Sequence, residues 1–382
     1  MQHQSSVFRA VLKHVPWDRF EKLVDEHRAD FRVRNLPTKT QLIALLYGQL
    51  SGASGLREIV SALESHEGRL YHLGAATTVA RSTLSDANTQ RSPAVFNGLL
   101  GLLIGQVHRK LRRDLDGTTY LIDSTGLRLS GLSDWARFST GVCGVKAHVV
   151  YDPDADCPVY LAVTAANVND ITAAQAMPIE AGATYVFDLG YYDYQWWAEL
   201  DAAGCRIVTR FKTNTPLTLI EELPVPKDSN ILSDRTGFLP ARQAGRRRNP
   251  MSNAVREIRV RMDNGKELRI LSNDLDAPAL EIAELYKRRW AIELFFRWVK
   301  QTLQITRFVG RSQNAIRIHI AVALIAFLLL RLAQAAQTAV KSPLAFARLV
   351  RINLMQRRPI DALQKPPPPP VPNPDQGLFQ WP

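Results

Sequence analysis

The sequence predicts a mixed α/β protein with a helical amino-terminal region, and three observations lead to this prediction. Apolar residues recur at helical spacing up to about residue 112, and beyond residue 117 they fall in short strand-like runs. Three neighbouring strand-like runs are followed by alternating helical and strand-like segments, which is the order of a mixed sheet. Two later runs with period two flank Asn264-Gly265, a dipeptide typical of tight hairpins.

The element order divides the 382 residues into five parts. Each part is defined by its expected structure: an all-helical domain at 1–112, the first part of the mixed-sheet core at 113–212, a β-rich insertion at 213–280, an amphipathic helix with packing helices that completes the core at 281–345, and a carboxy-terminal segment with a polyproline tail at 346–382. The basic stretch "RQAGRRRNP" (242–250) is expected to be a loop of the insertion, which either contacts phosphates or only keeps the loop soluble.

The core strands can be placed individually. The run "TTYLIDST" (118–125) is expected to end on Asp123, and "GVKAHVVYD" and "CPVYLAVT" follow it across a turn. A short helix is expected after "NVND", with Asp170 as its N-cap. The run "ATYVFDLGYYD" predicts a strand leading into Asp188, then a helix capped by Asp193 and a final strand, "CRIVTRFK".

Composition limits the classes of partner. Lys and Arg number 48 against 36 Asp and Glu, so the formal charge is +12 and the isoelectric point is about 9.8, which favours a polyanionic partner such as nucleic acid. A membrane surface is the competing partner, but the apolar run at 320–330 is about half of a membrane span and is expected to be a buried helix. No secretory signal is visible, and three scattered cysteines fit a reduced compartment, so a cytoplasmic protein is expected.

Two carboxylates, Asp123 and Asp188, follow apolar strands and precede loops that contain glycine. Each alone is more often a turn former. If the two strands are parallel neighbours, however, both side chains emerge at one edge of the sheet, where open α/β sheets place their sites.

The segment "YKRRWAIELFFRWVKQ" (286–301) places one carboxylate among positive charges. On a helix, Tyr286, Arg289, Glu293, Arg297 and Lys300 fall within an arc of about 80°, and apolar residues gather on another arc, so the helix is expected to bury one side and present the charged side outward. The simpler interpretation is a solvated face with i,i+4 ion pairs of a few tenths of a kcal/mol each.

Together, Asp123, Asp188 and Glu293 would supply three carboxylates, enough to hold two Mg²⁺ or Mn²⁺ ions about 4 Å apart for phosphodiester cleavage. The cations around Glu293 would then bind phosphates beside the metals.

These residues carry a family resemblance. The spacing of Tyr286, Arg289, Glu293 and Lys300 resembles the Tyr-Arg-Glu-Lys signature of bacterial insertion-sequence transposases of the DDE superfamily, insertion-sequence family 4. The runs "LIDSTGLRL" and "VFDLGYYD" look like the two aspartate strands of that family, and the similarity spans essentially residues 1–340.

The resemblance implies a ribonuclease-H-like core interrupted by a β-rich insertion, and cut-and-paste transposition. In that reaction Asp123, Asp188 and Glu293 ligate the metals, water attacks each element end, and the freed 3′-hydroxyl attacks target DNA. Tyr286, Arg289 and Lys300 would grip terminal phosphates. The implied partners are the terminal inverted repeats and target DNA, bound by a homodimer in the bacterial cytoplasm in association with the nucleoid and without a membrane.

Several other residues have two interpretations each. Lys146 and His148 either approach the site or are structural, and Arg210 and Lys212 either meet DNA or are solvated. The segment "RSTLSDANTQR" either reads the element end or is an ordinary surface helix. The acidic stretch at 152–156 lacks the glycine and glutamate of a calcium loop. The four tryptophans of the core region are expected to be buried: Trp196, Trp197, Trp290 and Trp298.

Three rival functions remain for a protein of this kind. The first is a relative that has lost catalysis and represses transposition by binding element ends, against which the three intact acids count. The second is a metal nuclease that only hydrolyses DNA, and the third is a protein that binds membrane surfaces through its basic residues.

Overall fold

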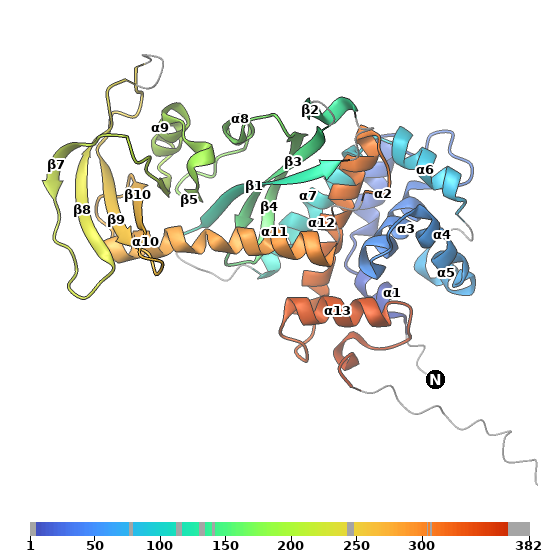
Figure 1. Ribbon diagram of the computed structural model, residues 1–382. Coiled ribbons are helices and arrows are strands. Elements are labelled where there is room, and N and C mark those ends of the chain that lie inside the picture. The colour runs from blue at the N-terminus through green and yellow to red at the C-terminus, as the bar shows by residue number, and fades with distance from the viewer. Residues whose placement is uncertain are drawn as a thin grey trace, which may run out of the picture.

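The protein has a large sheet at one side and a bundle of helices at the other, and one long pair of helices spans both (Figure 1). The computed structural model describes residues 5–75, 79–111, 117–129, 134–139, 142–242, 248–303, 305 and 308–365. Most of the basic loop at 242–250 and the polyproline tail lie outside these residues.

The amino-terminal region is helical up to residue 111, as its apolar periodicity predicts. Its most buried member is α3 (Thr38–Ser51), whose residues from Leu42 to Leu46 are almost fully covered. The other helices of this region are α1 (Val7–Leu12), α2 (Trp17–Glu26), α4 (Leu56–Glu64), α5 (Glu67–Leu73), α6 (Arg81–Gln90) and α7 (Ala94–Leu111).

The sheet contains ten strands in the described part of the chain, in the order β2-β3-β1-β5-β6-β10-β9-β8-β7, with β4 paired to β3. The strands are β1 (Thr119–Leu129), β2 (Arg137–Ser139), β3 (Val142–Asp152), β4 (Cys157–Ala165), β5 (Thr184–Phe187), β6 (Arg206–Arg210), β7 (Thr218–Glu222), β8 (Ile231–Phe238), β9 (Val255–Arg261) and β10 (Glu267–Ser272). The predicted mixed α/β fold is therefore observed.

The register of β1 and β5 places the two predicted aspartates beside each other. The strands are parallel, and Ile122 of β1 pairs with Phe187 of β5, so Asp123 and Asp188 are the next residues on adjacent strands. The sequence interpretation was wrong about where β1 ends. The strand continues to Leu129 because its antiparallel partner β3 extends the hydrogen-bond ladder beyond Asp123.

The β-rich insertion is not separate from the core sheet. Its hairpin β9–β10 forms at the predicted Asn264-Gly265 turn, where Gly265 has a φ of +77° and donates its N–H to the Met262 carbonyl. The last strand of that hairpin, β10, pairs with β6 of the core, so the insertion lengthens the same sheet. The outermost strand, β7, is exposed along its whole length.

Helices cover the sheet and connect it to the amino-terminal bundle. In Figure 1, α10 and α11 run in line along the sheet toward α12. The remaining helices are α8 (Asp170–Ala174), α9 (Tyr194–Ala202), α10 (Ala279–Arg288), α11 (Trp290–Thr302), α12 (Gln313–Ala335) and α13 (Pro343–Asn353), with short 3-10 turns η1 (Asp134–Ala136), η2 (Leu189–Tyr191) and η3 (Ile360–Ala362).

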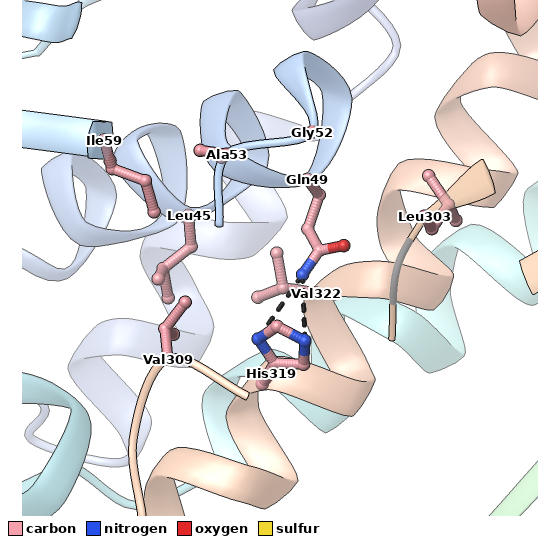
Figure 2. Close-up of a pocket in the computed structure, with 10 residues that line it drawn as sticks. Leu45, Gln49, Gly52, Ala53, Ile59, Leu303, Val309, His319 and Val322 are labelled. Atoms are coloured by element: carbon pink, nitrogen blue, oxygen red, sulfur yellow. Dashed lines mark hydrogen bonds between the residues drawn. The ribbon is translucent and has the colours of Figure 1, made fainter. Parts of the chain in front are cut away.

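The long apolar helix α12 lies in the middle of the protein, as the sequence predicts. Its length and mean hydropathy of 2.2 would suit a membrane span, yet 89% of its most apolar window is buried inside the protein. It packs against α3 and α7, and where it meets α3 the side chains of Gln49 and His319 are in contact, with Gln49 Nε2 3.2 Å from His319 Nε2 (Figure 2).

Candidate active site

Asp123 and Asp188 are each held by the backbone beside them. Asp123 lies within β1, and its Oδ1 accepts the N–H of Ser124 at 2.8 Å. Asp188 follows β5 and caps the turn η2, where its Oδ1 accepts the N–H of Gly190 at 2.8 Å. Both carboxylates are therefore fixed at the same edge of the parallel pair β1–β5.

Glu293 is linked to Asp123 through the side chain of Arg289. On α11, Arg289 Nη2 lies 2.6 Å from Glu293 Oε1, and Arg289 Nη1 lies 3.7 Å from Asp123 Oδ2. One guanidinium thus bridges the glutamate of the helix and the aspartate of the sheet.

The three carboxylates act on one another electrostatically. Burial raises the pKa of Asp123 to about 6, the Ser124 N–H opposes that rise, and the negative charges of Asp188 and Glu293 raise the pKa further, while Arg289 lowers it. The charges of Asp188 and Glu293 thus act on Asp123. The structure places Asp123 next to Asp188 at the end of the parallel pair and links Asp123 to Glu293 through Arg289.

The helix that carries Glu293 differs from the sequence interpretation in two ways. The segment is two helices, because α10 ends at Arg288 and α11 begins at Trp290. Part of its polar arc also faces the sheet and not the solvent, because Arg289 contacts both Asp123 of β1 and Glu293, whereas Arg297 remains exposed. The outward face carries Trp290, which is 50% exposed, so the prediction that it lies in the core is wrong, while Trp196 and Trp197 are buried as expected.

Two further signature residues lie near the carboxylates. Burial raises the pKa of Tyr286, which Arg289 and Arg210 oppose, and the Arg289 guanidinium lies 5.8 Å from the Tyr286 ring centre. Burial lowers the pKa of Lys300, and the negative charge of Asp123 opposes that effect. Arg289 thus contacts Asp123 and Glu293, and Tyr286 lies beside Arg289. Lys300 is near enough to Asp123, and Arg210 at the end of β6 near enough to Tyr286, for their charges to act.

Arg297 and Lys212 are placed differently. Arg297 is exposed on α11, and no contact with the carboxylates is among those described for it. Lys212 is exposed as well, and its ammonium lies 4.1 Å from the ring centre of Tyr192. Both cations are on the surface, where a large polyanion can reach them.

An acidic loop between β3 and β4 fixes the junction of α10 and α11. Arg288, the last residue of α10, forms an ion pair with Asp154. In the same loop, Asp156 lies 3.2 Å from Arg331 of α12, and Asp152 lies 3.0 Å from His108 of α7. The acidic stretch is thus a set of ion pairs with three helices. The ion pair with Asp154 also accounts for Arg288, which on a helical projection of residues 286–301 falls among the apolar side chains.

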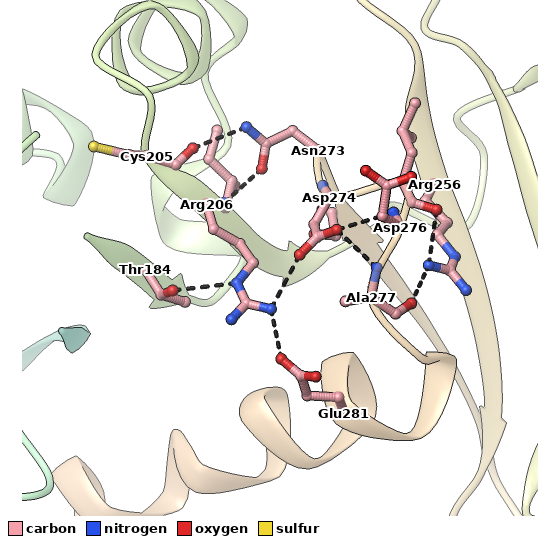
Figure 3. A network of polar contacts seen from close by, with 12 residues as sticks. Thr184, Cys205, Arg206, Arg256, Asn273, Asp274, Asp276, Ala277 and Glu281 are labelled. Carbon is pink, nitrogen blue, oxygen red and sulfur yellow. Dashed lines mark hydrogen bonds and ion pairs between the residues drawn. The ribbon is translucent and has the colours of Figure 1, made fainter. Parts of the chain in front are cut away.

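A second polar network holds the start of α10 against the sheet (Figure 3). Arg206 of β6 donates from Nη1 to Glu281 of α10 at 2.7 Å and to Asp274 at 3.0 Å, and from Nε to Thr184 of β5 at 3.2 Å. This network and the Arg288–Asp154 ion pair fix the two ends of α10, so the position of α11 follows from both.

Sequence reasoning missed the surroundings of Asp170. Asn169 occupies the N-cap position of α8, and Asp170 is the first helical residue, so the predicted cap was wrong. The Asp170 Oδ1 instead accepts from Ser124 Oγ at 2.8 Å and from Lys146 Nζ at 3.1 Å, and His148 Nδ1 is 3.6 Å away. The available signal was the pair of basic residues at 146 and 148, two apart and so on one face of a strand.

The donor set suits a hard divalent cation in its chemistry. Asp123, Asp188 and Glu293 offer carboxylate oxygens, the ligands that Mg²⁺ and Mn²⁺ prefer, and their mutual repulsion would be relieved by a cation between them. Within the described ranges, no three His, Cys, Asp or Glu side chains lie close enough together to enclose an ion. Glu293 would have to exchange its contact with Arg289 for such an ion.

Comparison with known proteins places the chain in a family. The family model described as a transposase DDE domain matches residues 114–329, and a domain of unknown function matches residues 3–76. A Sinorhizobium fredii protein named as the transposase y4zB is 40% identical over 75% of this chain and 80% of its own length. A Geobacillus stearothermophilus protein, named as a transposase for the insertion sequence element IS5377, is 29% identical over 65% of this chain and 66% of its own length.

Among solved structures, the piggyBac transposase in a synaptic complex with hairpin DNA aligns with 92% of this chain and 80% of that chain. The sequence identity is 10% and the TM-score is 0.46.

Proposed function

The chain belongs to the transposase DDE domain family and is a DNA-cleaving transposase of the insertion-sequence type, and from this premise we propose that it performs cut-and-paste transposition with two divalent ions. The observation that carries the proposal is that the parallel register of β1 and β5 places Asp123 beside Asp188, and that Arg289 links Asp123 to Glu293. Mg²⁺ or Mn²⁺ held by these three residues would activate water and stabilise the leaving oxygen at the scissile phosphate.

In this proposal the protein's own groups position the DNA end. Arg289, released from Glu293, binds a terminal phosphate together with Tyr286 and Lys300, because all three surround the carboxylates. The more exposed cations, Arg210, Lys212 and Arg297, contact backbone phosphates further along the duplex. The amino-terminal helices supply recognition of the terminal inverted repeats, and α6 is the candidate reader through its exposed Arg81, because Arg91 at its other end is bound within the bundle by Gln41.

The architecture we propose for the catalytic part is a ribonuclease-H-like core, supported by the order β3-β1-β5-β6 with β1, β5 and β6 parallel. The core is completed by α11 after the β-rich insertion. Because two element ends must be held at once, the active form is a homodimer on DNA. It works in the bacterial cytoplasm in association with the nucleoid, independently of membranes.

The test uses labelled duplexes of the inverted repeats that flank the gene, a target plasmid and Mg²⁺. Wild-type protein is expected to cut the ends and join them to the plasmid. Asp188→Asn should abolish both products, while the Kd for the end duplex stays within about twofold, because the metal ligand is lost and the DNA-binding surface remains.

The matched control is Asp193→Asn, since Asp193 caps α9 a few residues further on and has no described contact with the three acids. Cutting without joining would identify a hydrolytic nuclease. End binding without cutting by the wild type would identify the silent repressor.

A further inference from the structure

We propose that Asp170 is a positioning residue that sets the separation of Asp123 and Asp188. This inference rests on the proposed function, because it concerns the two aspartates that would hold the ions. Asp170 belongs to α8, labelled in Figure 1, which lies between the two aspartate strands in the sequence and contacts η2 in space.

The first link runs from Asp170 to the strand of Asp123. The hydroxyl of Ser124 donates to Asp170 Oδ1 at 2.8 Å, and the backbone N–H of the same serine donates to Asp123 Oδ1 at 2.8 Å. A shift of Asp170 therefore moves the residue whose N–H orients the first catalytic carboxylate.

The second link runs from Asp170 to the turn of Asp188. A Cβ added to Gly190 would lie 3.2 Å from Asp170 Oδ2 and 3.0 Å from Asp188 Oδ1. The glycine therefore lets two carboxylates approach the same backbone point, and its N–H is the donor that Asp188 accepts. Asp170 thus contacts strand β1 through the hydrogen bond from Ser124, and it packs close to the Gly190 turn that holds Asp188.

Asp170 is itself fixed from the other side, by β3. Lys146 Nζ donates to Asp170 Oδ1 at 3.1 Å and to the carbonyl of Val168 at 3.1 Å. His148, 1% exposed, lies 3.6 Å from the same oxygen and is held by Thr164 Oγ1 at 2.8 Å from its Nε2. A carboxylate with a lysine partner and a rigid histidine beneath it has little freedom, which is what a positioning group requires.

Tyr191, next to Gly190, lies within the electrostatic influence of Asp123, Asp170 and Asp188. Its ring is buried, and the negative charges of Asp123, Asp170 and Asp188 all act on its hydroxyl. Asp170 is therefore part of the same electrostatic environment as the two catalytic aspartates, although its oxygens are directed to Ser124, Lys146 and the Gly190 turn.

The experiment measures metal binding directly as well as cleavage. Mn²⁺ is titrated into the protein bound to a terminal-repeat duplex and followed by electron paramagnetic resonance, and Mg²⁺-dependent end cleavage is measured in parallel. Asp170→Ala is expected to raise the half-saturating concentration of both ions by roughly tenfold or more, with the Kd for the duplex within about twofold. Asp170→Asn should show a smaller shift, because its amide oxygen still accepts from Ser124.

A second variant makes the inference testable if Asp170→Ala fails to fold. Ser124→Ala leaves Asp170 in place and removes the hydroxyl that donates to it, while the backbone N–H that Asp123 accepts is kept, and the half-saturating metal concentration is expected to rise in the same direction. Asp193→Asn is the control for altered caps near this edge, and its metal dependence should match that of the wild type.

Wild-type metal binding in both Asp170→Ala and Ser124→Ala would overturn the inference while leaving the transposase proposal intact. A wild-type protein that neither binds Mn²⁺ on the duplex nor cuts it would overturn the proposed function, and the inference with it.

Discussion

Asp123 carries its negative charge in surroundings that oppose it. The carboxylate is mostly buried, and two further acids face it, so the pKa of Asp123 rises to about 6 from an ordinary value of 3.8. Arg289 compensates only in part, because its closer contact, at 2.6 Å, is with Glu293. At neutral pH the carboxylates of the metal-free site therefore repel one another, and a divalent cation would reduce that repulsion.

Removing that charge should stabilise the metal-free protein. Because the pKa of Asp123 is raised in the folded state, the protonated carboxyl contributes to the stability of the fold. That contribution is fully present below about pH 4 and is lost as pH rises through about 6. Asp123→Asn is therefore expected to unfold at higher denaturant concentration than wild type at pH 7, by about 2–3 kcal/mol, with the difference shrinking toward pH 4. Urea unfolding in EDTA across this pH range measures it.

The control for this prediction is Asp193→Asn, whose side chain is a helix cap. Its pH dependence should parallel that of the wild type. A pH-independent difference between Asp123→Asn and wild type would show that packing, and not charge, separates them.

At this scale the sequence predicts candidate metal ligands but not how they are placed. Asp123, Asp188 and Glu293 can be singled out from two strand ends and from the signature spacing around Glu293, and their role as ligands stays a prediction. Asp170 was not recognised, because its partners at 124, 146 and 190 are distant in sequence and only the folded sheet edge brings them together. The inward orientation of Arg289 and Glu293 likewise depends on the acid they meet on β1.

Helix α10 is positioned at both ends by ion pairs that contribute little to stability. The Arg288–Asp154 pair is about one-third exposed, and such pairs contribute at most about 1 kcal/mol each. Their importance is geometric, because Arg288 immediately precedes the residue that bridges Asp123 and Glu293. A small displacement there moves the third carboxylate relative to the other two.

We therefore expect Asp154→Arg to slow end cleavage by roughly tenfold to a hundredfold, while the free energy of unfolding changes by less than about 1 kcal/mol. Single-turnover cleavage and urea unfolding are the two measurements. The charge-reversed double variant Asp154→Arg with Arg288→Asp should recover much of the rate. Equal losses of rate and stability in the single variant, with no recovery in the double, would contradict this role.

The hairpin β9–β10 was predictable because its turn chemistry is local, in that Gly265 takes the positive φ that the turn requires. The attachment of that hairpin to β6 was not. Strand pairing between β6 and β10 joins residues about 60 positions apart, and no local signal specifies the partner of an edge strand. The same limitation explains why β1 extends beyond Asp123, since its length depends on β3.

Across the whole molecule, the amino-terminal bundle and the catalytic part share one continuous apolar core through α12. A buried polar contact at that interface is the contact of Gln49 with His319, shown in Figure 2. Burial lowers the pKa of His319 to about 4, so the imidazole is neutral at physiological pH.

The interface should therefore weaken in mild acid. A histidine with a depressed folded-state pKa contributes stability that is fully present above its ordinary value of 6.5 and is lost as pH falls through about 4. His319→Gln is expected to reduce the loss of stability between pH 6.5 and 4. The free energy of unfolding lost by the wild type over this range should exceed that lost by the variant by up to about 3 kcal/mol, and the pH dependence of the thermal midpoint measures this difference. His72, on the surface helix α5, supplies the control as His72→Gln, which should keep the wild-type slope.

The position of α12 has a consequence for synthesis of the chain. The helices that pack around it, α3 and α7, leave the ribosome roughly 200 residues earlier, so their apolar surfaces stay uncovered for roughly 10–40 s at ordinary translation rates. During that interval the nascent bundle has no native partner for those surfaces. A cell that makes this protein must therefore shield an unfinished amino-terminal half until α12, in the last quarter of the chain, has been translated, and termination before that point would release an aggregation-prone fragment.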